Sequence, residues 1–174
     1  MKNAIRITSG KYRGREISTP GVGTHPMGAR EKLALFNMLT GVLPGARVLD
    51  AFAGSGALGI EAISRGAKSV VFVEKSTSAA SIIKKNLTSL DLEGVTRVFA
   101  MDITNFQPDT KFDLILADPP YDNFDLNKIL PLTNFMEQNA ILALSHPGGS
   151  PEMPGLKLLK ARQYAGATIS IYQA

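Results

Sequence analysis

The chain lacks cysteine altogether, and its 174 residues include only two histidines, His25 and His146. The absence of cysteine excludes disulfide bonds, thiolate metal sites and cysteine nucleophiles, and two histidines make a zinc site unexpected. No apolar run is long enough to span a membrane, and the first 16 residues contain no signal-peptide core. We therefore expect a cytoplasmic protein with neither a metal site nor a membrane partner.

Excess positive charge is absent from most of the chain. Residues 1–32 contain seven Lys and Arg against two acids, a net charge of +5, whereas the remainder contains twelve against thirteen, a net charge of −1. Lys and Arg gathered in one segment are the electrostatic footprint of a polyanion-binding protein. Charge alone leaves two interpretations open, which are nucleic-acid binding and a simple solvated hairpin.

The size of the chain indicates one domain that spans residues 1–174. A chain of this length buries about 70% of its unfolded surface, so its core needs no covalent cross-links. Residues 4–18 alternate apolar and polar side chains around two glycines, which predicts a short β-hairpin, and a loop rich in Gly and Pro follows. We expect residues 1–27 to form a basic hairpin-and-loop appendage.

The first predicted helix covers residues 29–43. Leu33, Phe36, Leu39 and Leu43 recur there at helical spacing, which predicts one buried apolar face.

The rest of the chain alternates predicted strands and helices. Near-continuous apolar strands between helices indicate an α/β fold, with a mostly parallel sheet covered by helices on both faces. The last two segments can return as an antiparallel pair at the edge of the sheet. The predicted strands are 46–52, 68–74, 95–102, 112–118, 139–146, 156–164 and 167–174, and the predicted helices are 57–66, 76–90 and 124–133.

Acidic residues close four successive predicted strands: Asp50, Glu74, Asp102 and Asp118. Acids often follow strands because they cap the next helix. In open parallel sheets, however, ligands bind beyond the carboxyl ends of the strands, where these four side chains would gather. Four acids in series favour a binding edge over capping alone.

A glycine loop follows the first acid. Gly54, Gly56 and Gly59 form a G-x-G-x-x-G pattern between a predicted strand and a helix, which is typical of dinucleotide sites but is weak evidence alone. An ionised Asp50 beside this loop would repel a pyrophosphate, whereas it suits the sulfonium and ammonium cations of S-adenosylmethionine (SAM). The loop therefore favours SAM, with a dinucleotide or a loop shaped only by packing as the alternatives.

The most informative segment is FDLILADPPYD at 112–122, where a buried strand ends in Asp118 and two prolines. Methyl transfer to the exocyclic amine of a base requires hydrogen-bond acceptors that direct the nitrogen lone pair. The Asp118 carboxylate and the Pro119 carbonyl supply two acceptors, and the proline pair makes their loop stiff. Tyr121 can stack on a base that has been swung out of its helix, for about 1–3 kcal/mol. The alternative is a rigid turn with Tyr121 in the core.

With these motifs in view, the chain resembles the RsmD-like 16S ribosomal RNA guanine-N2 methyltransferases, a family of Rossmann-like SAM-dependent enzymes. The resemblance runs nearly end to end and is loosest over 123–155. The matching stretches are SGKYRGREISTP at 9–20, LALFNML at 33–39, VLDAFAGSGALGIEAISRGAKSVVFVEK at 48–75, KKNL at 84–87, FDLILADPPYD at 112–122 and YAGATISIY at 164–172.

The resemblance implies a Rossmann-like SAM-methyltransferase sheet, SAM as the cofactor, and ribosomal RNA or a small ribosomal subunit particle as the partner. The implied SAM-binding residues are Asp50, Phe52, Ala53, Gly54, Gly56, Glu74, Lys75, Asp102 and Ile103. The implied catalytic residues are Asp118, Pro119, Pro120 and Tyr121. The implied RNA-binding residues are Lys11, Arg13, Arg15 and Arg30.

One segment departs from the family pattern. Where the family usually has Arg-Pro-Thr and then an Asp-Arg pair, this chain reads THPMGAREK at 24–32, with His25, Met27 and Ala29 at changed positions. Leu33 stands where a glutamate is expected. His25 is either a substitute ligand contact or an exposed loop residue, and the polar contacts of this segment are open.

Four rival functions remain at this stage. A DNA adenine-N6 methyltransferase can use the same DPPY tetrapeptide, but a chain this short has no obvious DNA-recognition domain. The others are another RNA amino-methyltransferase, a dinucleotide-dependent oxidoreductase, and an RNA-binding module without catalysis.

Overall fold

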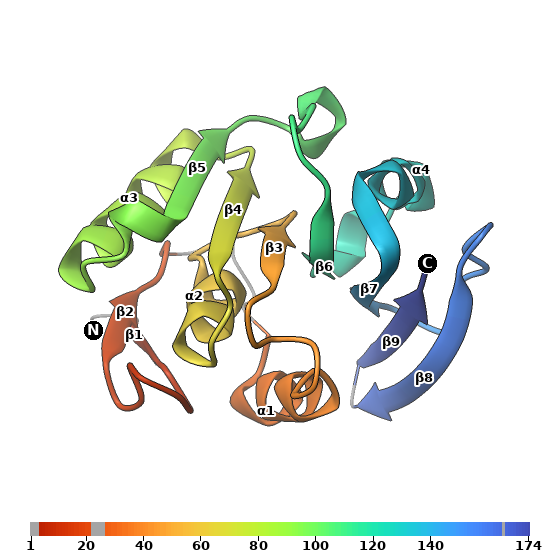
Figure 1. Cartoon of the computed structure of the whole chain (residues 1–174), viewed down its shortest axis with the longest axis horizontal. Helices are drawn as coiled ribbons and strands as arrows, with labels where there is room; N and C mark the ends of the chain where they lie inside the picture. Colours follow the sequence, from red (N-terminus) through yellow and green to blue (C-terminus); the bar gives the residue numbers. More distant parts are fainter. Residues whose placement is uncertain (1–3, 22–26, 165) are drawn as a thin grey trace.

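The computed structural model describes residues 4–21, 27–164 and 166–174 (Figure 1). His25 therefore lies outside the described residues. A two-stranded antiparallel sheet, β1 (Ala4–Arg6) and β2 (Glu16–Ser18), confirms the N-terminal hairpin. The strands of the main sheet are β3 (Arg47–Asp50), β4 (Ser69–Glu74), β5 (Thr96–Ala100), β6 (Phe112–Ala117), β7 (Met136–His146), β8 (Lys157–Tyr164) and β9 (Ala167–Gln173).

The main sheet has the strand order β5-β4-β3-β6-β7-β9-β8. Strands β3 to β7 are parallel to one another, and β9 runs antiparallel between β7 and β8. The mostly parallel sheet is confirmed; the strand that reverses is β9, one place in from the edge strand β8. The order reverses between β3 and β6, which is the switch point where open α/β sheets bind ligands.

Helices cover both faces of the sheet, as predicted (Figure 1). One face packs against the hairpin and the three longer helices, and the other packs against short helical turns. The longer helices are α1 (Ala29–Met38), α2 (Ala57–Ser64) and α3 (Thr77–Ser89). The short elements are η1 (Glu93–Val95), η2 (Ile103–Asn105), η3 (Tyr121–Asn123), α4 (Leu126–Ile129) and η4 (Leu130–Phe135). No helix in the described part of the chain is long and apolar enough to cross a membrane.

Helix α1 differs from the prediction in its length and at one position of its predicted buried face. It ends at Met38 rather than at residue 43, and Leu33 is 45% exposed. Lys32 is buried instead, beside Leu35 and Phe36. Phe36, Leu39 and Leu43 are buried as predicted, so the apolar spacing identified the right face and misplaced only Leu33.

A buried acid on the neighbouring helix explains why α1 turns Lys32 inward. The Lys32 ammonium lies 3.3 Å from the Glu61 carboxylate, which also accepts hydrogen bonds from the Thr8 hydroxyl at 2.6 Å and the Ser9 amide at 3.0 Å. Arg65 pairs with the same carboxylate at 2.9 Å. Burial alone would raise the pKa of Glu61, but the bonds from Thr8 and the two cations outweigh it and lower that pKa. This network fastens the hairpin to α1 and α2.

The tip of the hairpin rests on the last turn of α2. The Lys11 amide donates to the Ser64 carbonyl at 2.8 Å, and the Tyr12 amide donates to the Ser64 hydroxyl at 3.0 Å. Gly10 has a φ of +80°, and a Cβ there would come within 1.7 Å of the Ser64 carbonyl oxygen. The hairpin tip therefore lies about 10 Å along the helix from the start of α2, on the side away from the carboxyl edge of the sheet.

The other end of the hairpin is pinned beside the glycine loop. The buried Asn86 side chain accepts from the Ser18 amide at 2.9 Å and donates to the Ser18 carbonyl at 2.9 Å and the Ser55 carbonyl at 3.1 Å. One amide thus joins α3, β2 and the loop that opens α2.

Candidate active site

Three acids converge at the carboxyl edge of the sheet. Asp50 ends β3 and Glu74 ends β4, while Asp118 directly follows β6, the other neighbour of β3. They are close enough to interact, because burial raises the pKa of Asp50 most and the charges of Asp118 and Glu74 raise it further. No basic side chain is paired with any of the three among the described residues, so the edge is suited to a cation.

Asp50 lies deepest in this edge. Its side chain is 1% exposed, one oxygen accepts the Gly59 amide at 2.9 Å, and the other oxygen, Oδ1, has no hydrogen-bond partner. Burial raises the pKa of Asp50 to about 7. Buried carboxylate oxygens are normally satisfied, so an orphan oxygen here indicates a missing cationic or hydrogen-bonding partner.

The glycines of the loop have different tasks. Gly59 lies against the core, because a Cβ there would come within 2.2 Å of the Phe72 ring. Gly56 has a φ of +80° at the start of α2. Gly54 also has a positive φ, and a Cβ on it would meet nothing within 4 Å. Packing therefore explains Gly59, while open space beside Gly54 leaves room for a ligand.

Glu74 is bound to the glycine loop. Its carboxylate accepts the Gly54 amide at 2.8 Å and the Ser76 amide at 2.8 Å, which aligns the loop with the end of β4. The neighbouring Lys75 is exposed. Phe52 is half-buried and Ala53 is buried, so the structure brings these residues together with Asp50 at the same edge.

Asp102 lies one strand further out, after β5. It caps η2 by accepting the Thr104 amide at 3.0 Å, and that bond first, with a weaker effect from Lys128 at 3.5 Å, lowers its pKa. For Asp102, therefore, the alternative interpretation holds: this acid caps the helical turn that follows its strand. Ile103 is buried at 6% exposure among core side chains.

The DPPY segment turns sharply at the end of β6. Asp118 is partly exposed, Pro119 is buried and Pro120 is exposed with a φ of −62°. Burial raises the pKa of Asp118 to about 6, against the opposing effect of hydrogen bonds from Ser145 and Tyr121. The Tyr121 hydroxyl lies 3.5 Å from the Asp118 carboxylate and shares a short hydrogen bond with the Ser145 hydroxyl.

Ser145 was missed by the sequence reasoning. It is 2% exposed near the end of β7, and the pairing of Ala117 with Leu144 places it next to Asp118 across the sheet. The available signal was that the strand at 139–146 ends in polar Ser and His, but only the strand order shows that it adjoins β6. Tyr121 is consequently held at its hydroxyl end.

An apolar hollow adjoins this corner on the α1 side. It is too narrow to hold a water molecule and lies between α1, the start of α2 and strands β6, β7 and β9. It is lined by Met27, Leu35, Leu58, Ala117, Ala143, Leu144, Ser145 and Ile169. Met27 therefore contributes to this wall, although it departs from the family pattern.

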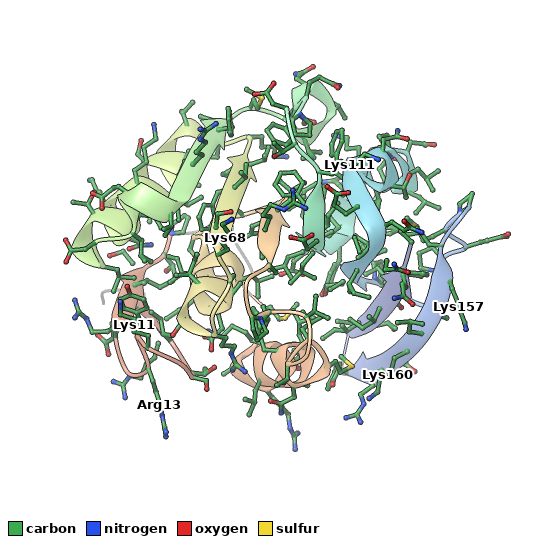
Figure 2. The ribbon with its side chains drawn as sticks, viewed as in Figure 1. Lys11, Arg13, Lys68, Lys111, Lys157 and Lys160 are labelled. Carbon is green, nitrogen blue, oxygen red and sulfur yellow. The ribbon has the colours of Figure 1, made fainter. Side chains whose placement is uncertain are left out.

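The four predicted RNA-binding residues do not form one group. Lys11 and Arg13 are exposed at the hairpin tip, far from the DPPY corner (Figure 2). Arg15 donates to the Ser89 carbonyl at 3.1 Å, so part of its guanidinium is already engaged. Arg30 is exposed on the first turn of α1. This turn lies near the DPPY corner, because the charge of the adjacent Glu31 adds to the main effect of burial in raising the pKa of Tyr121.

His146 has a structural environment. Its ring is buried, with Nε2 2.8 Å from the Ser170 hydroxyl and Nδ1 3.2 Å from the Pro147 carbonyl. Within residues 4–21, 27–164 and 166–174, no group of three or more His, Asp or Glu is arranged to hold a metal ion.

Comparison with known proteins identifies the class. The family model described as Conserved hypothetical protein 95 matches residues 5–173. The Haemophilus influenzae protein named Ribosomal RNA small subunit methyltransferase D is 33% identical over 99% of this chain and 95% of its own length. The Escherichia coli K12 protein of that name is 37% identical over 80% of this chain and 70% of its own.

Solved structures agree with this result. The Escherichia coli protein yhhF has a TM-score of 0.88 and 31% identity, and the match covers 98% of this chain and 97% of that one. Fold and relatives together define an enzyme of the methyltransferase class. The chain belongs to the Conserved hypothetical protein 95 family, and the predicted resemblance to the RsmD-like enzymes is confirmed.

Proposed function

We propose that this protein transfers a methyl group from SAM to the exocyclic N2 amine of a guanine in small-subunit ribosomal RNA, as a single cytoplasmic domain over residues 1–174. The names of its relatives support the ribosomal RNA substrate. The observation that carries the chemistry is the acidic edge without a basic partner, where one buried oxygen of Asp50 has no hydrogen-bond partner and the charges of Asp118 and Glu74 act on the same carboxylate.

The residues at this edge fit SAM. A cation satisfies the orphan oxygen of Asp50 and lowers its pKa, whereas a pyrophosphate would be repelled by three neighbouring carboxylates. Phe52, Ala53, Gly54 and Gly56 would border the methionine part of the cofactor. When bound, SAM supplies an activated methyl group on a sulfonium.

The outer strands would hold the nucleoside part of SAM. Glu74 retains free lone pairs beside its two amide bonds and would accept the ribose hydroxyls, with Lys75 next to it. Asp102 and Ile103 would border the adenine.

The DPPY corner would orient the amine. The ionised Asp118 carboxylate accepts one N–H of the guanine amine, and the Pro119 carbonyl accepts the other, which directs the nitrogen lone pair at the donor. Pro119 and Pro120 hold φ near −65°, so these acceptors need no reorganisation. The Tyr121 ring stacks on the base, and Lys11, Arg13, Arg15 and Arg30 contact RNA phosphates.

The test is incubation with labelled SAM and small-subunit RNA or particles, followed by identification of the product nucleoside. We expect N2-methylguanosine from the wild type. Asp118→Asn should lose at least a hundredfold in turnover while SAM affinity, measured by calorimetry, stays the same. N6-methyladenine as the product, or binding of NAD instead of SAM, would refute the proposal.

A further inference from the structure

We propose that the edge strand β8 is a second RNA-binding surface, which contacts phosphates of the substrate through the basic β8 face: Lys157, Lys160 and Arg162. This inference rests on the proposed function, because it takes the substrate to be RNA.

The charge of β8 is of one sign and is open to solvent. All residues from Lys157 to Gln163 are exposed, and the strand contains no acid. None of its three cations takes part in an ion pair with another described residue. Because β8 is the last strand of the sheet, nothing in the described chain covers its outer edge.

A β-bulge brings the three cations to the same face. Lys157 pairs with Gln173 and Lys160 pairs with Ile171, and the register shifts by one residue between Leu158 and Lys160. Without that extra residue, Lys157 and Lys160 would point to opposite faces. Since Gln173 and Ile171 are two residues apart on β9, their partners share one face of the sheet, and Arg162, two residues on, shares it too.

This face is the one that carries the apolar hollow of the active site. Arg162 pairs with Ile169 on β9, and Ile169 pairs with Ser145 on β7. Ile169 and Ser145 both line the hollow beside Asp118. At about 4.8 Å per strand, three steps place the backbone of Arg162 roughly 14 Å from that of Asp118 in the same cross-strand row. A nucleotide neighbouring the target base could span this distance.

Lysines on an exposed edge strand also prevent edge-to-edge aggregation, which is the simpler explanation of their presence. Protection against aggregation does not require the cations to share one face of the sheet, since a lysine on either face of the strand repels another edge equally well. The alignment of the three cations by the bulge, on the face that carries the hollow, favours a polyanion. Figure 2 shows Lys157 and Lys160 on the opposite flank from Lys11 and Arg13, so the two basic surfaces would contact separate parts of the RNA.

The experiment compares two variants that change the net charge equally on opposite faces of β8. Lys160→Gln/Arg162→Gln removes two charges from the basic face, and Ala161→Glu/Gln163→Glu adds two negative charges to the other face. RNA affinity is measured against salt concentration by fluorescence anisotropy with a small-subunit RNA, and methylation and SAM affinity are measured alongside.

For the basic-face variant we expect affinity for RNA to fall roughly tenfold, and the slope of log affinity against log salt to become shallower by about 1.4, which corresponds to two lost phosphate contacts. SAM affinity should be unchanged, which also shows that the variant is folded. The opposite-face variant should keep the wild-type slope. Equal losses in both variants, or an unchanged slope in the first, would overturn the inference.

Two further outcomes separate this inference from the proposed function. If the wild type produces no methylguanosine but the basic-face variant still loses RNA affinity and slope, the surface is supported and the reaction is refuted. If the variant binds and methylates free RNA normally but fails on ribosomal particles, the face binds a protein and the inference is wrong.

Discussion

At the scale of single residues, the burial of the Asp50 carboxylate beside the proposed SAM site lowers the free energy of unfolding when that carboxylate is ionised. Its folded-state pKa of about 7 exceeds the ordinary value of 3.8. Folding therefore favours the protonated form, so the contribution of Asp50 to stability is present below pH 4 and is lost as the pH rises through 7. A bound cation would remove this cost by pairing with the ionised carboxylate.

Asp50→Asn should consequently make the ligand-free protein more stable at pH 8, by an amount on the order of 2 kcal/mol, and should weaken SAM binding at least tenfold. Asparagine can still accept the Gly59 amide bond, so the fold is preserved. Urea unfolding at pH 5 and pH 8, with calorimetry for SAM, measures both effects. The stability gain should shrink at pH 5; an equal gain at both values would show that the charge of Asp50 is not its cause.

Ser145 is the second residue-scale case, because it acts through Tyr121. Ser145→Ala should lower kcat about fivefold, as expected for a net hydrogen bond of about 1 kcal/mol that holds Tyr121 and Asp118 in place. Tyr121→Phe should behave similarly, and the double variant should lose little more than either single change, since both remove the same bond. SAM affinity should not change.

A matched control is Ser145→Thr, which retains the hydroxyl and should recover most of the rate. Additive losses in the double variant would separate the two residues, and a loss of SAM affinity would show a general structural defect instead.

At the scale of elements, Asn86 joins three segments with one side chain. Asn86→Ala leaves the Ser18 amide and carbonyl without their partner at a partly buried place, and the Ser55 carbonyl without its partner at a buried one. We expect a loss of about 2–4 kcal/mol in unfolding free energy and weaker SAM binding, because the glycine loop loses a support. The control is Asn37→Ala on the exposed face of α1, which should change stability by less than about 0.5 kcal/mol. Equal effects of the two variants would contradict the role of Asn86.

Elements with a strong local signal were predictable. Continuous apolar segments predicted the strands of the sheet, and the glycine loop and the DPPY segment predicted the two ends of the proposed site. Each of these patterns consists of a few consecutive residues, so it can be recognised without knowledge of the fold. The burial of Lys32 on α1 was not predictable, since it depends on Glu61, which lies on a neighbouring helix. Ser145 and the basic β8 face depend on strand order and on a bulge, which are properties of the assembled sheet.

At the scale of the whole molecule, exposed positive charge is found on two separated surfaces, the tip of the N-terminal hairpin and the basic β8 face. The N-terminal cations were the predicted RNA contacts, but the hairpin tip lies away from the carboxyl edge of the sheet, whereas β8 lies in line with that edge. The two surfaces belong to opposite flanks of the sheet (Figure 2). An RNA that reaches the DPPY corner could therefore touch either flank independently.

Lys11→Gln/Arg13→Gln should reduce the salt slope of RNA binding by about 1.4, as two phosphate contacts are lost. Arg15 is left intact because it is engaged with the Ser89 carbonyl. Combined with Lys160→Gln/Arg162→Gln, the reduction should approach 2.8, since sites farther apart than a Debye length of about 10 Å act additively. Lys111→Gln, which Figure 2 places apart from both surfaces, is the control and should leave the slope unchanged. A combined slope no shallower than that of either pair would mean that the RNA contacts only one flank.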